Sequence, residues 1–206
     1  MRLAPVPSLP DIQLYATHPG TGLWRLDAAT GSDGEPPAPY WAFVWAGGLV
    51  LARFLADAPG RVAGRRVLDF GAGSGLVAIA AAQAGAAAVS AAEIDPNGIA
   101  ALTLNAAANG VTIIAIAGDL VEGPPPAVDI VLAGDVFYAP EVAARVLPFL
   151  ERCLAAGVEV LVGDPHRAHL PEARLRLIAE YQVPDFGQPD PMALRPSGVF
   201  ELLPAG

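Results

Sequence analysis

The sequence is poor in cysteine and lacks any long uninterrupted hydrophobic segment. Cys153 is the only cysteine in 206 residues, so no internal disulfide and no cysteine-based zinc cluster can form. Every long apolar run is interrupted by Asp, Glu, Arg, Gly or Pro before the roughly 18 residues that a membrane span needs. The first residues, MRLAPVPSLPD, contain no apolar segment of the kind found in secretory signals. We therefore expect a soluble protein with a cytoplasmic localisation.

Basic residues are also scarce. The chain has 12 Lys and Arg residues against 21 Asp and Glu residues, which gives a formal net charge of −9. A field of this sign repels phosphate backbones, so nucleic acid is not expected as a substrate. His166 and His169 lack the further ligands of a metal site, so no metal is expected. With 53% hydrophobic residues, a chain of this length predicts one domain with one substantial core.

The N-terminal residues 1–39 are rich in Pro, Gly and Thr and predict a cap segment rather than a domain. Within this cap, two short strands are expected at residues 12–15 and 23–26, on either side of a turn. Residues 40–206 are expected to form the main domain. Its first helix is predicted at residues 45–58, where apolar residues recur at helical spacing until a Pro-Gly pair.

From residue 66 onward, short apolar strands alternate with helical segments, which predicts an α/β fold with a largely parallel sheet and helices on both faces. Strands are predicted at residues 67–70, 88–93, 112–116, 128–134 and 158–163, and helices at residues 74–84, 96–109, 140–155 and 168–180. Two last strands, 181–185 and 198–203, are joined by a Pro-rich link too short for a crossover helix. They predict an antiparallel hairpin at the sheet edge, which completes a Rossmann-like, seven-stranded mixed sheet.

The segment VLDFGAGSGLVAIAAA, residues 67–82, places a glycine-rich turn between a strand and a helix. It has neither the lysine of a phosphate-binding P-loop nor the third glycine of a dinucleotide fingerprint at its proper offset. Gly71 and Gly73 instead allow the backbone to approach a ligand closely, and a helix starting near Ser74 offers its positive end to a carboxylate. Asp69 would complement an ammonium or a sulfonium. The turn therefore fits an amino-acid-like cationic ligand.

Acidic residues also end the next two strands. Glu93 is placed for the two hydroxyls of a ribose, with Ile94 beside it, while Asp95 is either a further ligand or the N-cap of the following helix. Asp119 would accept a hydrogen bond from an exocyclic amine, and the Leu120 amide would meet a ring nitrogen. A cationic amino acid, a ribose and an adenine together describe S-adenosylmethionine, which is the expected cofactor.

These motifs, VLDFGAGSG, AAEIDP, AGDL and DIVLAGDVFY, resemble in their order those of the class I, seven-stranded S-adenosylmethionine-dependent methyltransferases. The upstream PYWAFVWAGGLVLARFL and the GDVFY segment are more narrowly similar to the family 16 protein lysine methyltransferases. The resemblance covers roughly residues 38–203. It implies the strand order 3-2-1-4-5-7-6, methyl transfer to lysine side chains, and the electron transfer flavoprotein β-subunit as the protein substrate.

The resemblance also places the reacting groups. Asp135 and Tyr138 match the motif that lines the lysine channel of this family. Because a lysine amine is almost fully protonated at neutral pH, our hypothesis is that Asp135 captures the ammonium and that its proton passes to water before methyl transfer. Trp45 and Tyr138 would wall the channel, and Trp45 is assigned either to the cofactor site or to the core. The alternative role of Asp135 is to cap the helix that starts after Ala139.

Other functions fit parts of the same pattern. Val136 and Phe137 stand where an N6-adenine methyltransferase has two prolines, which disfavours a base-modifying enzyme. A methyltransferase acting on a small molecule and a non-catalytic cofactor-binding module are the alternatives. A lid formed by the N-terminal cap and residues 185–197 would favour a small molecule, whereas an open channel would favour a protein. The end of the fifth strand supplies further candidates for substrate contact: Asp164, His166 and Arg167.

Overall fold

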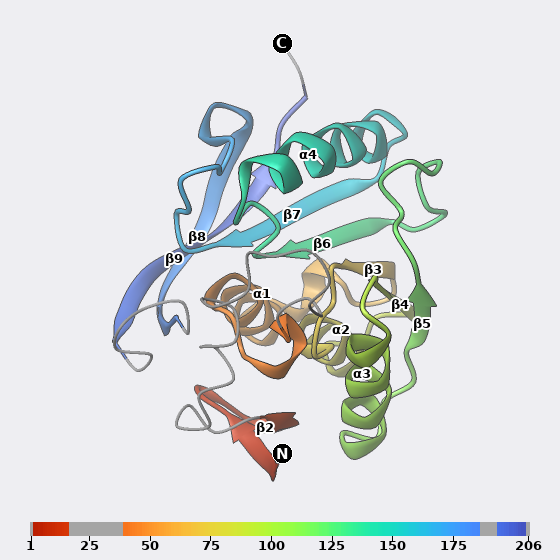
Figure 1. Ribbon diagram of the computed structural model, residues 1–206, viewed down its shortest axis with the longest axis vertical. Helices are drawn as coiled ribbons and strands as arrows, with labels where there is room; N and C mark the ends of the chain where they lie inside the picture. Colours follow the sequence, from red (N-terminus) through yellow and green to blue (C-terminus); the bar gives the residue numbers. More distant parts are fainter. Residues whose placement is uncertain (1, 17–38, 186–192, 205–206) are drawn as a thin grey trace, which may run out of the picture.

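The computed structural model describes residues 2–16, 39–185 and 193–204, and a seven-stranded sheet runs through its centre (Figure 1). Its strands are Arg66–Phe70 (β3), Ala88–Glu93 (β4), Ile114–Ala117 (β5), Ile130–Gly134 (β6), Glu159–Asp164 (β7), Leu175–Pro184 (β8) and Leu194–Leu202 (β9). They lie in the order β5-β4-β3-β6-β7-β9-β8. β3 to β7 are parallel, whereas β9 is antiparallel to β7 and β8. Counted from β3, the predicted order 3-2-1-4-5-7-6 and the reversed last pair are confirmed.

Side chains alternate along the strands and divide the core into two layers, one on each face of the sheet. In β3, Val67 packs with three helices, whereas Leu68 and Phe70 pack with a fourth. Figure 1 shows these two groups of helices on opposite sides of the sheet. The three are Ala46–Asp57 (α1), Leu76–Gln83 (α2) and Pro96–Ala108 (α3), and the fourth is Pro140–Ala155 (α4). Burial on both faces explains why these strands read as short, continuous apolar runs.

The helix predicted at residues 168–180 is wrong. The structure has one 3-10 turn, Glu172–Arg174 (η5), followed by the long edge strand β8, which pairs with β9. Apolar residues alternate in β8, but Ile178 interrupts the alternation. Ile178 is the extra residue of a bulge between Leu177 and Ala179, where the pairing register shifts. The bulge hid the two-residue period by which a strand is recognised in a sequence.

The N-terminal cap begins with a two-stranded antiparallel hairpin of Arg2–Val6 (β1) and Leu9–Ala16 (β2). The strand predicted at residues 12–15 is confirmed, but its partner precedes it in the chain. The partner predicted at residues 23–26 lies outside the described residues. β1 was missed because it contains Pro5, and a proline is unusual in a strand and is tolerated only at an edge. The division of the chain after residue 39 stays a prediction.

Two asparagines, Asn105 in α3 and Asn109 at its C-cap, hold β2 against this helix. Asn105 Oδ1 accepts a hydrogen bond from the Tyr15 N–H at 2.8 Å. Asn109 uses both ends of its amide, because Oδ1 accepts from the Gln13 N–H at 2.9 Å and Nδ2 donates to the Gln13 carbonyl at 2.6 Å. The amides thus supply the partners that a neighbouring strand would give to the β2 backbone.

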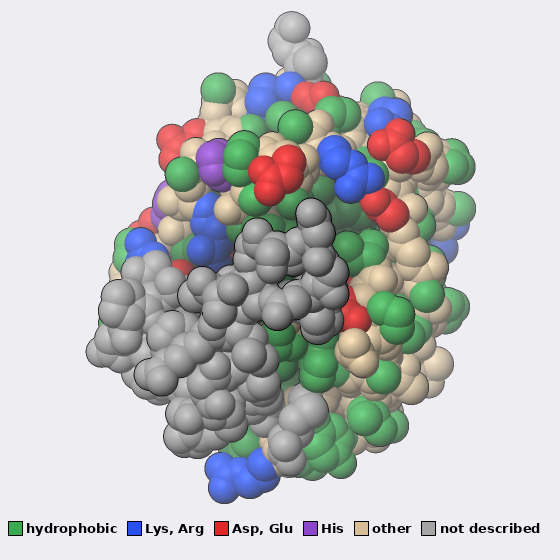
Figure 2. All heavy atoms as spheres, in the orientation of Figure 1, with side chains coloured by type: hydrophobic (Ala, Val, Ile, Leu, Met, Phe, Trp, Pro, Cys, Tyr) green, Lys and Arg blue, Asp and Glu red, His purple; other side chains and the backbone are tan. Residues whose placement is uncertain are grey.

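The surface mixes both signs of charge. Figure 2 shows acidic and basic side chains lying next to one another on the side that carries α4. Many of the arginines form ion pairs, as Arg66 does with Asp129 and Arg145 with Asp119, each at 2.6 Å. In the part of the chain that the structure describes, no helix is long and apolar enough to cross a membrane.

Candidate active site

The carboxyl ends of β3 and β6 and the start of α1 enclose a pocket of about 60 Å³. In open α/β sheets this edge is where ligands bind. The pocket walls combine bare backbone, two carboxylates and aromatic rings. Among the predicted site residues, the following line it: Trp45, Asp69, Gly71, Gly73, Ser74 and Asp135. The structure therefore brings the predicted cofactor turn and the predicted reacting carboxylate to one place.

The backbone N–H groups of the glycine turn form hydrogen bonds within the protein. The N–H groups of Gly71 and Ala72 both donate to the Ala92 carbonyl, at 3.1 and 2.9 Å, and the Gly73 N–H donates to Glu93 at 2.8 Å. Gly71 and Gly73 have φ angles of +71° and +51°, which glycine adopts without strain. A phosphate cradle would need those N–H groups to point at the ligand. Their use inside the fold agrees with the prediction that the turn does not hold a phosphate.

Ser74 and Gly75 fix the turn against α3. The Ser74 carbonyl accepts from Asn105 Nδ2 at 2.8 Å. Gly75 has a φ of +82°, which favours glycine, and a Cβ atom there would lie 2.3 Å from Leu102 Cδ1, so the end of that side chain would have to move. Asn105 also holds Tyr15 of β2, so one buried side chain connects the turn, α3 and the N-terminal hairpin.

Asp69 is buried beneath the turn and caps α2. This helix begins at Leu76, two residues later than predicted, and its N-cap residue is Gly75, which has no side chain to cap with. Asp69 Oδ2 takes over by accepting from the Ala78 N–H at 2.9 Å. Burial raises the pKa of Asp69 to about 7, although the Ala78 hydrogen bond opposes the rise. A cation beside this carboxyl would favour its ionised form.

Glu93 ends β4 next to the glycine turn. Its Oε2 accepts from the Gly73 N–H, and its Oε1 accepts from the N–H groups of Ile94 at 2.8 Å and Asp95 at 2.9 Å. The carboxylate is therefore held at the strand tip, and its binding to a ribose stays a prediction. Asp95 is the N-cap of α3, since its side chain accepts from the Asn97 N–H at 2.8 Å. The capping role considered for Asp95 is thus confirmed.

Asp119 follows β5 at the third strand tip. Its side chain forms an ion pair with Arg145 at 2.6 Å and accepts from the Val121 N–H at 3.0 Å. The Val121 hydrogen bond, and then Arg145, hold the pKa of Asp119 below its usual value. Leu120 is half-buried beside it, and Ile94 at the neighbouring tip is 72% exposed. The part of the site predicted for adenine is therefore an open surface.

The strand order sets Asp119, Glu93 and Asp69 in a row along one edge of the sheet. Neighbouring strands lie roughly 4.8 Å apart, so the row spans about 10 Å, the length scale of a nucleoside joined to an amino acid. The pocket of about 60 Å³ is smaller than a complete small-molecule site of ~300 Å³ or more, so it is one part of such a site. The sequence predicts the cationic end of S-adenosylmethionine at the Asp69 turn and its nucleoside along these strand tips.

Asp135 lies directly after β6 with a φ of +55°, a left-handed conformation uncommon outside glycine. Its Oδ2 accepts from the N–H groups of Gly47 and Gly48, the latter at 3.2 Å, so Asp135 caps α1. The cap predicted for the helix after Ala139 is wrong, because α4 begins there without a side-chain cap. Burial raises the pKa of Asp135, and the guanidinium of Arg167 opposes that rise.

Glycines let α1 reach the strand ends. A Cβ atom at Gly47 would lie 2.2 Å from the Gly163 carbonyl oxygen, and one at Gly134 would lie 2.8 Å from Gly48 Cα. Contacts this short do not occur between real side chains and backbone, so helix and strands can meet only where Cβ is absent. The lack of side chains at Gly47 and Gly134 therefore explains how the helix terminus comes close enough to bind Asp135.

Aromatic rings form the outer wall of the pocket. Trp45 Nε1 donates to the Tyr40 carbonyl at 2.7 Å, and the centroids of the two rings are 5.7 Å apart. The Tyr40 ring in turn lies 5.4 Å from that of Tyr138, which is 46% exposed. Trp45 and Tyr40 line the pocket, whereas Tyr138 lies outside the lining and contacts the ring of Tyr40, a residue that sequence reasoning missed. Trp45 lines the pocket, and its role in the cofactor site stays a prediction.

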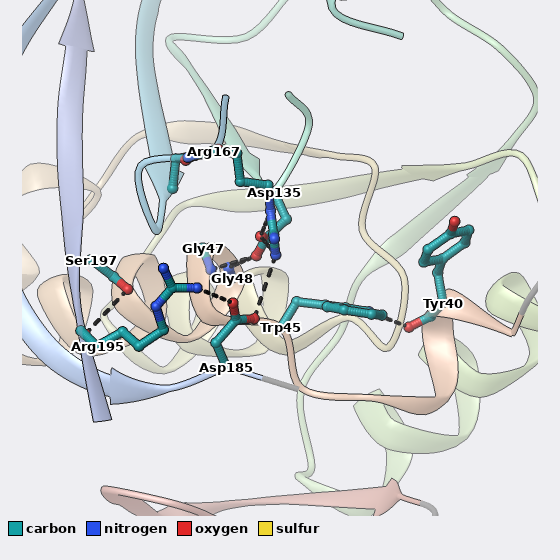
Figure 3. A network of polar contacts seen from close by, with 10 residues as sticks. Tyr40, Trp45, Gly47, Gly48, Asp135, Arg167, Asp185, Arg195 and Ser197 are labelled. Carbon is teal, nitrogen blue, oxygen red and sulfur yellow. Dashed lines mark hydrogen bonds and ion pairs between the residues drawn. The ribbon is translucent and has the colours of Figure 1, made fainter. Parts of the chain in front are cut away.

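An arginine after β7 completes the site (Figure 3). Arg167 Nε and Nη2 donate to Asp135 Oδ1 at 2.8 and 2.5 Å, and the guanidinium lies 6.0 Å from the Trp45 ring centroid. Its Nη2 also lies 3.5 Å from the buried Asp185, which pairs with Arg195 at 3.4 Å. Sequence reasoning missed Asp185 and Arg195. The predicted strand 181–185 ends at Asp185, so an acid at a strand end was the available signal, but it was not used.

No metal centre emerges among the described residues, since nowhere in them do three or more His, Cys, Asp or Glu side chains gather to hold an ion. His166, one of the candidates for substrate contact, lies 3.7 Å from Glu180 rather than in the pocket. Its companions Asp164 and Arg167 both face the Asp135 region.

Comparison of the sequence with known proteins finds relatives along almost the whole chain. The rat electron transfer flavoprotein β-subunit lysine methyltransferase (Rattus norvegicus) is 36% identical over 95% of this chain and 78% of its own length. The human protein of the same name (Homo sapiens) is 34% identical over 95% of this chain and 76% of its own length. The model of the ribosomal protein L11 methyltransferase (PrmA) family matches residues 57–137.

Solved structures share the fold. The ribosomal protein L11 methylase of Lactobacillus delbrueckii subsp. bulgaricus superimposes with a TM-score of 0.55 at 23% identity, covering 77% of this chain and 79% of that one. Magnesium protoporphyrin IX methyltransferase of Synechocystis PCC 6803, with bound S-adenosylhomocysteine, gives 0.54 at 17% identity over 90% and 94%. At these identities the likeness concerns the fold alone.

Proposed function

Because the chain belongs to the family of electron transfer flavoprotein β-subunit lysine methyltransferases, we propose that it methylates lysine side chains of the electron transfer flavoprotein β-subunit. The enzyme uses S-adenosylmethionine as its methyl donor. The observation that carries the proposal is the row of strand-tip carboxylates leading into a pocket walled by Asp135 and Trp45. Cofactor groups and an acceptor amine would meet in that pocket.

Each part of the row matches one part of the cofactor. Asp69 and the bare backbone of Gly71 and Gly73 would hold the amino-acid end, because a buried carboxylate favours a cation. Glu93 would bind the ribose hydroxyls, and Asp119 the adenine amine. When bound, S-adenosylmethionine supplies a methyl group activated by the positive sulfur. The protein supplies alignment and a partly dry pocket.

Methyl transfer requires the substrate lysine in its neutral amine form. A lysine ammonium in water has a pKa of about 10.4, so it must lose a proton before it can attack. Asp135 would hold the arriving ammonium, and the rings of Trp45 and Tyr138 would keep its alkyl chain in line. Burial at this wall lowers the pKa of the ammonium, and its proton leaves Nζ for water. Asp135 then acts by attraction and alignment and need not be a strong base.

The exposure of the aromatic wall favours a protein substrate over a small molecule. Tyr40, which lines the pocket, is 42% exposed, and its neighbour Tyr138 is 46% exposed, so a lysine side chain could reach this wall from the molecular surface. On the sequence alone, a lid formed by the N-terminal cap and residues 185–197 would favour a small molecule. Most of these segments lie outside the described residues, which exclude residues 17–38 and 186–192. Open access to the acceptor wall therefore carries this choice.

Fractionated lysate tests the class of substrate. The enzyme is incubated with labelled S-adenosylmethionine and either the protein fraction or the small-molecule fraction of a bacterial lysate. We expect label in a protein band and little in the small-molecule pool. The chain contains no lysine, so its own band is an internal blank. Label confined to the small-molecule pool would favour the alternative methyltransferase, and cofactor binding without transfer would favour a non-catalytic module.

The Asp135→Asn variant locates the acceptor. Its side-chain oxygen can still accept from the α1 N–H groups, but it has lost the charge that attracts an ammonium. We expect transfer to fall by roughly a hundredfold or more, which corresponds to about 2.7 kcal/mol, with cofactor affinity close to that of the unchanged protein. Equal losses of transfer and of cofactor affinity would show that Asp135 serves the cofactor instead.

Two further properties belong to the same proposal. The net charge of −9 supports a substrate other than nucleic acid, because like charges repel. A cytoplasmic location stays a prediction from the sequence.

A further inference from the structure

The Asp135 carboxylate has every acceptor position filled. Oδ2 accepts from the N–H groups of Gly47 and Gly48, while Oδ1 accepts from both Nε and Nη2 of Arg167. A carboxylate oxygen offers about two acceptor positions, so a substrate ammonium finds none open. The two backbone donors are fixed in α1. Arg167, a side chain, is therefore the donor that has to leave when a lysine arrives.

A second acceptor for Arg167 already lies beside it. Asp164 is fully buried at the end of β7, and its Oδ1 accepts from the Arg167 N–H at 2.6 Å. Its Oδ2 is buried and has no hydrogen-bond partner among the described residues. An unpaired buried oxygen is costly and calls for an explanation. Asp185, buried on the other side, already lies 3.5 Å from Arg167 Nη2.

From this geometry we infer that Arg167 occupies the substrate ammonium site in the free enzyme and transfers to Asp164 and Asp185 when a lysine binds. The inference rests on the proposed transfer to lysine. The lysine ammonium replaces the Arg167 guanidinium on Asp135 Oδ1, and no covalent bond breaks. Arg167 stays within the cluster, so the only charge added is that of the lysine. Asp164 Oδ2 gains the donor that it lacks.

The exchange also serves the resting enzyme. A buried carboxylate without a positive partner is strongly unfavourable, and Arg167 prevents that state whenever substrate is absent. The guanidinium stands 6.0 Å from the Trp45 ring, so its departure uncovers an aromatic face that favours the arriving cation. Arg167 is thus a positioning residue, which keeps Asp135 ionised and correctly placed until substrate takes over.

Nuclear magnetic resonance of arginine Nε–H groups tests the exchange without any methyl transfer. The probe is n-butylammonium, which copies the end of a lysine side chain. The Arg167 signal, assigned by its loss in Arg167→Lys, should move on titration, and Asp164→Asn should weaken the apparent affinity at least several-fold. Arg66 is the matched control, since it donates Nε and Nη2 to Asp129 at the opposite end of the sheet. An Arg167 signal that moves no more than that of Arg66 would overturn the exchange.

The absence of lysine from the chain allows a second test. Arg167→Lys places one lysine on Asp135, where the substrate amine is proposed to sit. With S-adenosylmethionine we expect its intact mass to gain methyl groups: the ammonium proton passes to water, Nζ bonds the methyl carbon as the carbon–sulfur bond breaks, and S-adenosylhomocysteine is released. Arg66→Lys, equally paired with an aspartate, should gain none, and it corrects for the terminal amine.

The outcomes separate this inference from the proposed function. Methylation of Lys at position 167, together with no activity on the electron transfer flavoprotein, would remove the substrate assignment and retain the exchange. Activity on the electron transfer flavoprotein without methylation of the Arg167→Lys variant would count against a shared ammonium site, provided that this variant folds by circular dichroism and binds cofactor. If that variant fails to fold, the resonance titration of the unchanged protein still decides the question.

Discussion

The buried carboxyl group of Asp69 has two roles. It replaces the missing side chain of Gly75 as the cap of α2, and it forms the floor of the pocket proposed for the cationic end of the cofactor. Its capping role needs only an acceptor oxygen, whereas its cofactor role needs a negative charge. Asparagine at this position would keep the first role and lose the second.

The raised pKa of Asp69 makes cofactor binding depend on pH. With a pKa of about 7 in the free protein, Asp69 is largely protonated below pH 7, and a cation can bind well only to the ionised form. Affinity should therefore rise with pH and level off above about 7, with a loss of up to about tenfold for each pH unit below that value. Calorimetry in two buffers of different ionisation enthalpy should detect the released proton.

The control for this linkage is Asp69→Asn. It should bind the cofactor more weakly at high pH and lose most of the pH dependence, while its unfolding temperature stays close to that of the unchanged protein. An unaltered pH profile in the variant would assign the titration to another group.

At the scale of elements, the start of α1 is the part that joins the fold to the chemistry. Asp135 caps this helix, Trp45 precedes it, and its first turn touches the ends of β6 and β7 through glycines. The site therefore depends on how closely α1 approaches the sheet, a distance that the glycines set.

Replacing Gly47 by alanine should push α1 away from the sheet. The new Cβ would meet the Gly163 carbonyl oxygen at 2.2 Å and Asp135 Oδ2 at 2.6 Å, and neither can move freely. Overpacking of this kind costs roughly 1–3 kcal/mol, and each kcal/mol lowers Tm by about 2–4 °C in a protein of this size. Methyl transfer should also fall, since Asp135 is displaced.

Its neighbour supplies the matched control. A Cβ atom at Gly48 would lie 3.8 Å from the nearest atom, Val77 Cγ2, which is an ordinary contact. Alanine there should be neutral or stabilise the helix by up to about 1 kcal/mol. Equal melting temperatures for the two variants would show that α1 is not held at the distance described.

What the sequence could and could not predict follows from the range of the interactions. Periodicity, turn residues and strand-end acids are local, and they were enough for the seven strands with a reversed last pair, the cofactor turn and the approximate ends of α3 and α4, whereas the strand order came from the family resemblance. The pairing of Arg167 with Asp135 joins residues 32 positions apart, and no local pattern encodes it. In β8, Ile178 interrupts the alternation of apolar residues by which a strand is recognised. Only the pairing with β9 shows that it is a bulge within one continuous strand, and that pairing cannot be read from the local sequence.

For the whole molecule, the excess of negative charge is the dominant long-range property. Most described arginines are paired with carboxylates, so the unbalanced charges are acidic. A lysine-bearing surface of a protein substrate would be attracted from a distance and oriented before contact. This steering acts on the rate of encounter more than on the bound complex.

Salt should therefore slow the reaction at low substrate. We expect kcat/KM to fall several-fold between about 20 and 200 mM salt, because the Debye length shrinks to about 10 Å or less, while kcat changes little. A neutral osmolyte at matched viscosity is the control. A kcat/KM that does not respond to salt would show that encounter with the substrate is not steered by charge.

Transfer to a defined lysine tests the central claim most directly. Purified electron transfer flavoprotein is incubated with the enzyme and S-adenosylmethionine carrying a deuterated methyl group, and its peptides are analysed by mass spectrometry. We predict deuterated methyl on lysine Nζ of the β-subunit with the unchanged enzyme, and almost none with Asp135→Asn. A β-subunit that stays unmodified under conditions where the enzyme binds cofactor, or label on another residue type, would contradict it.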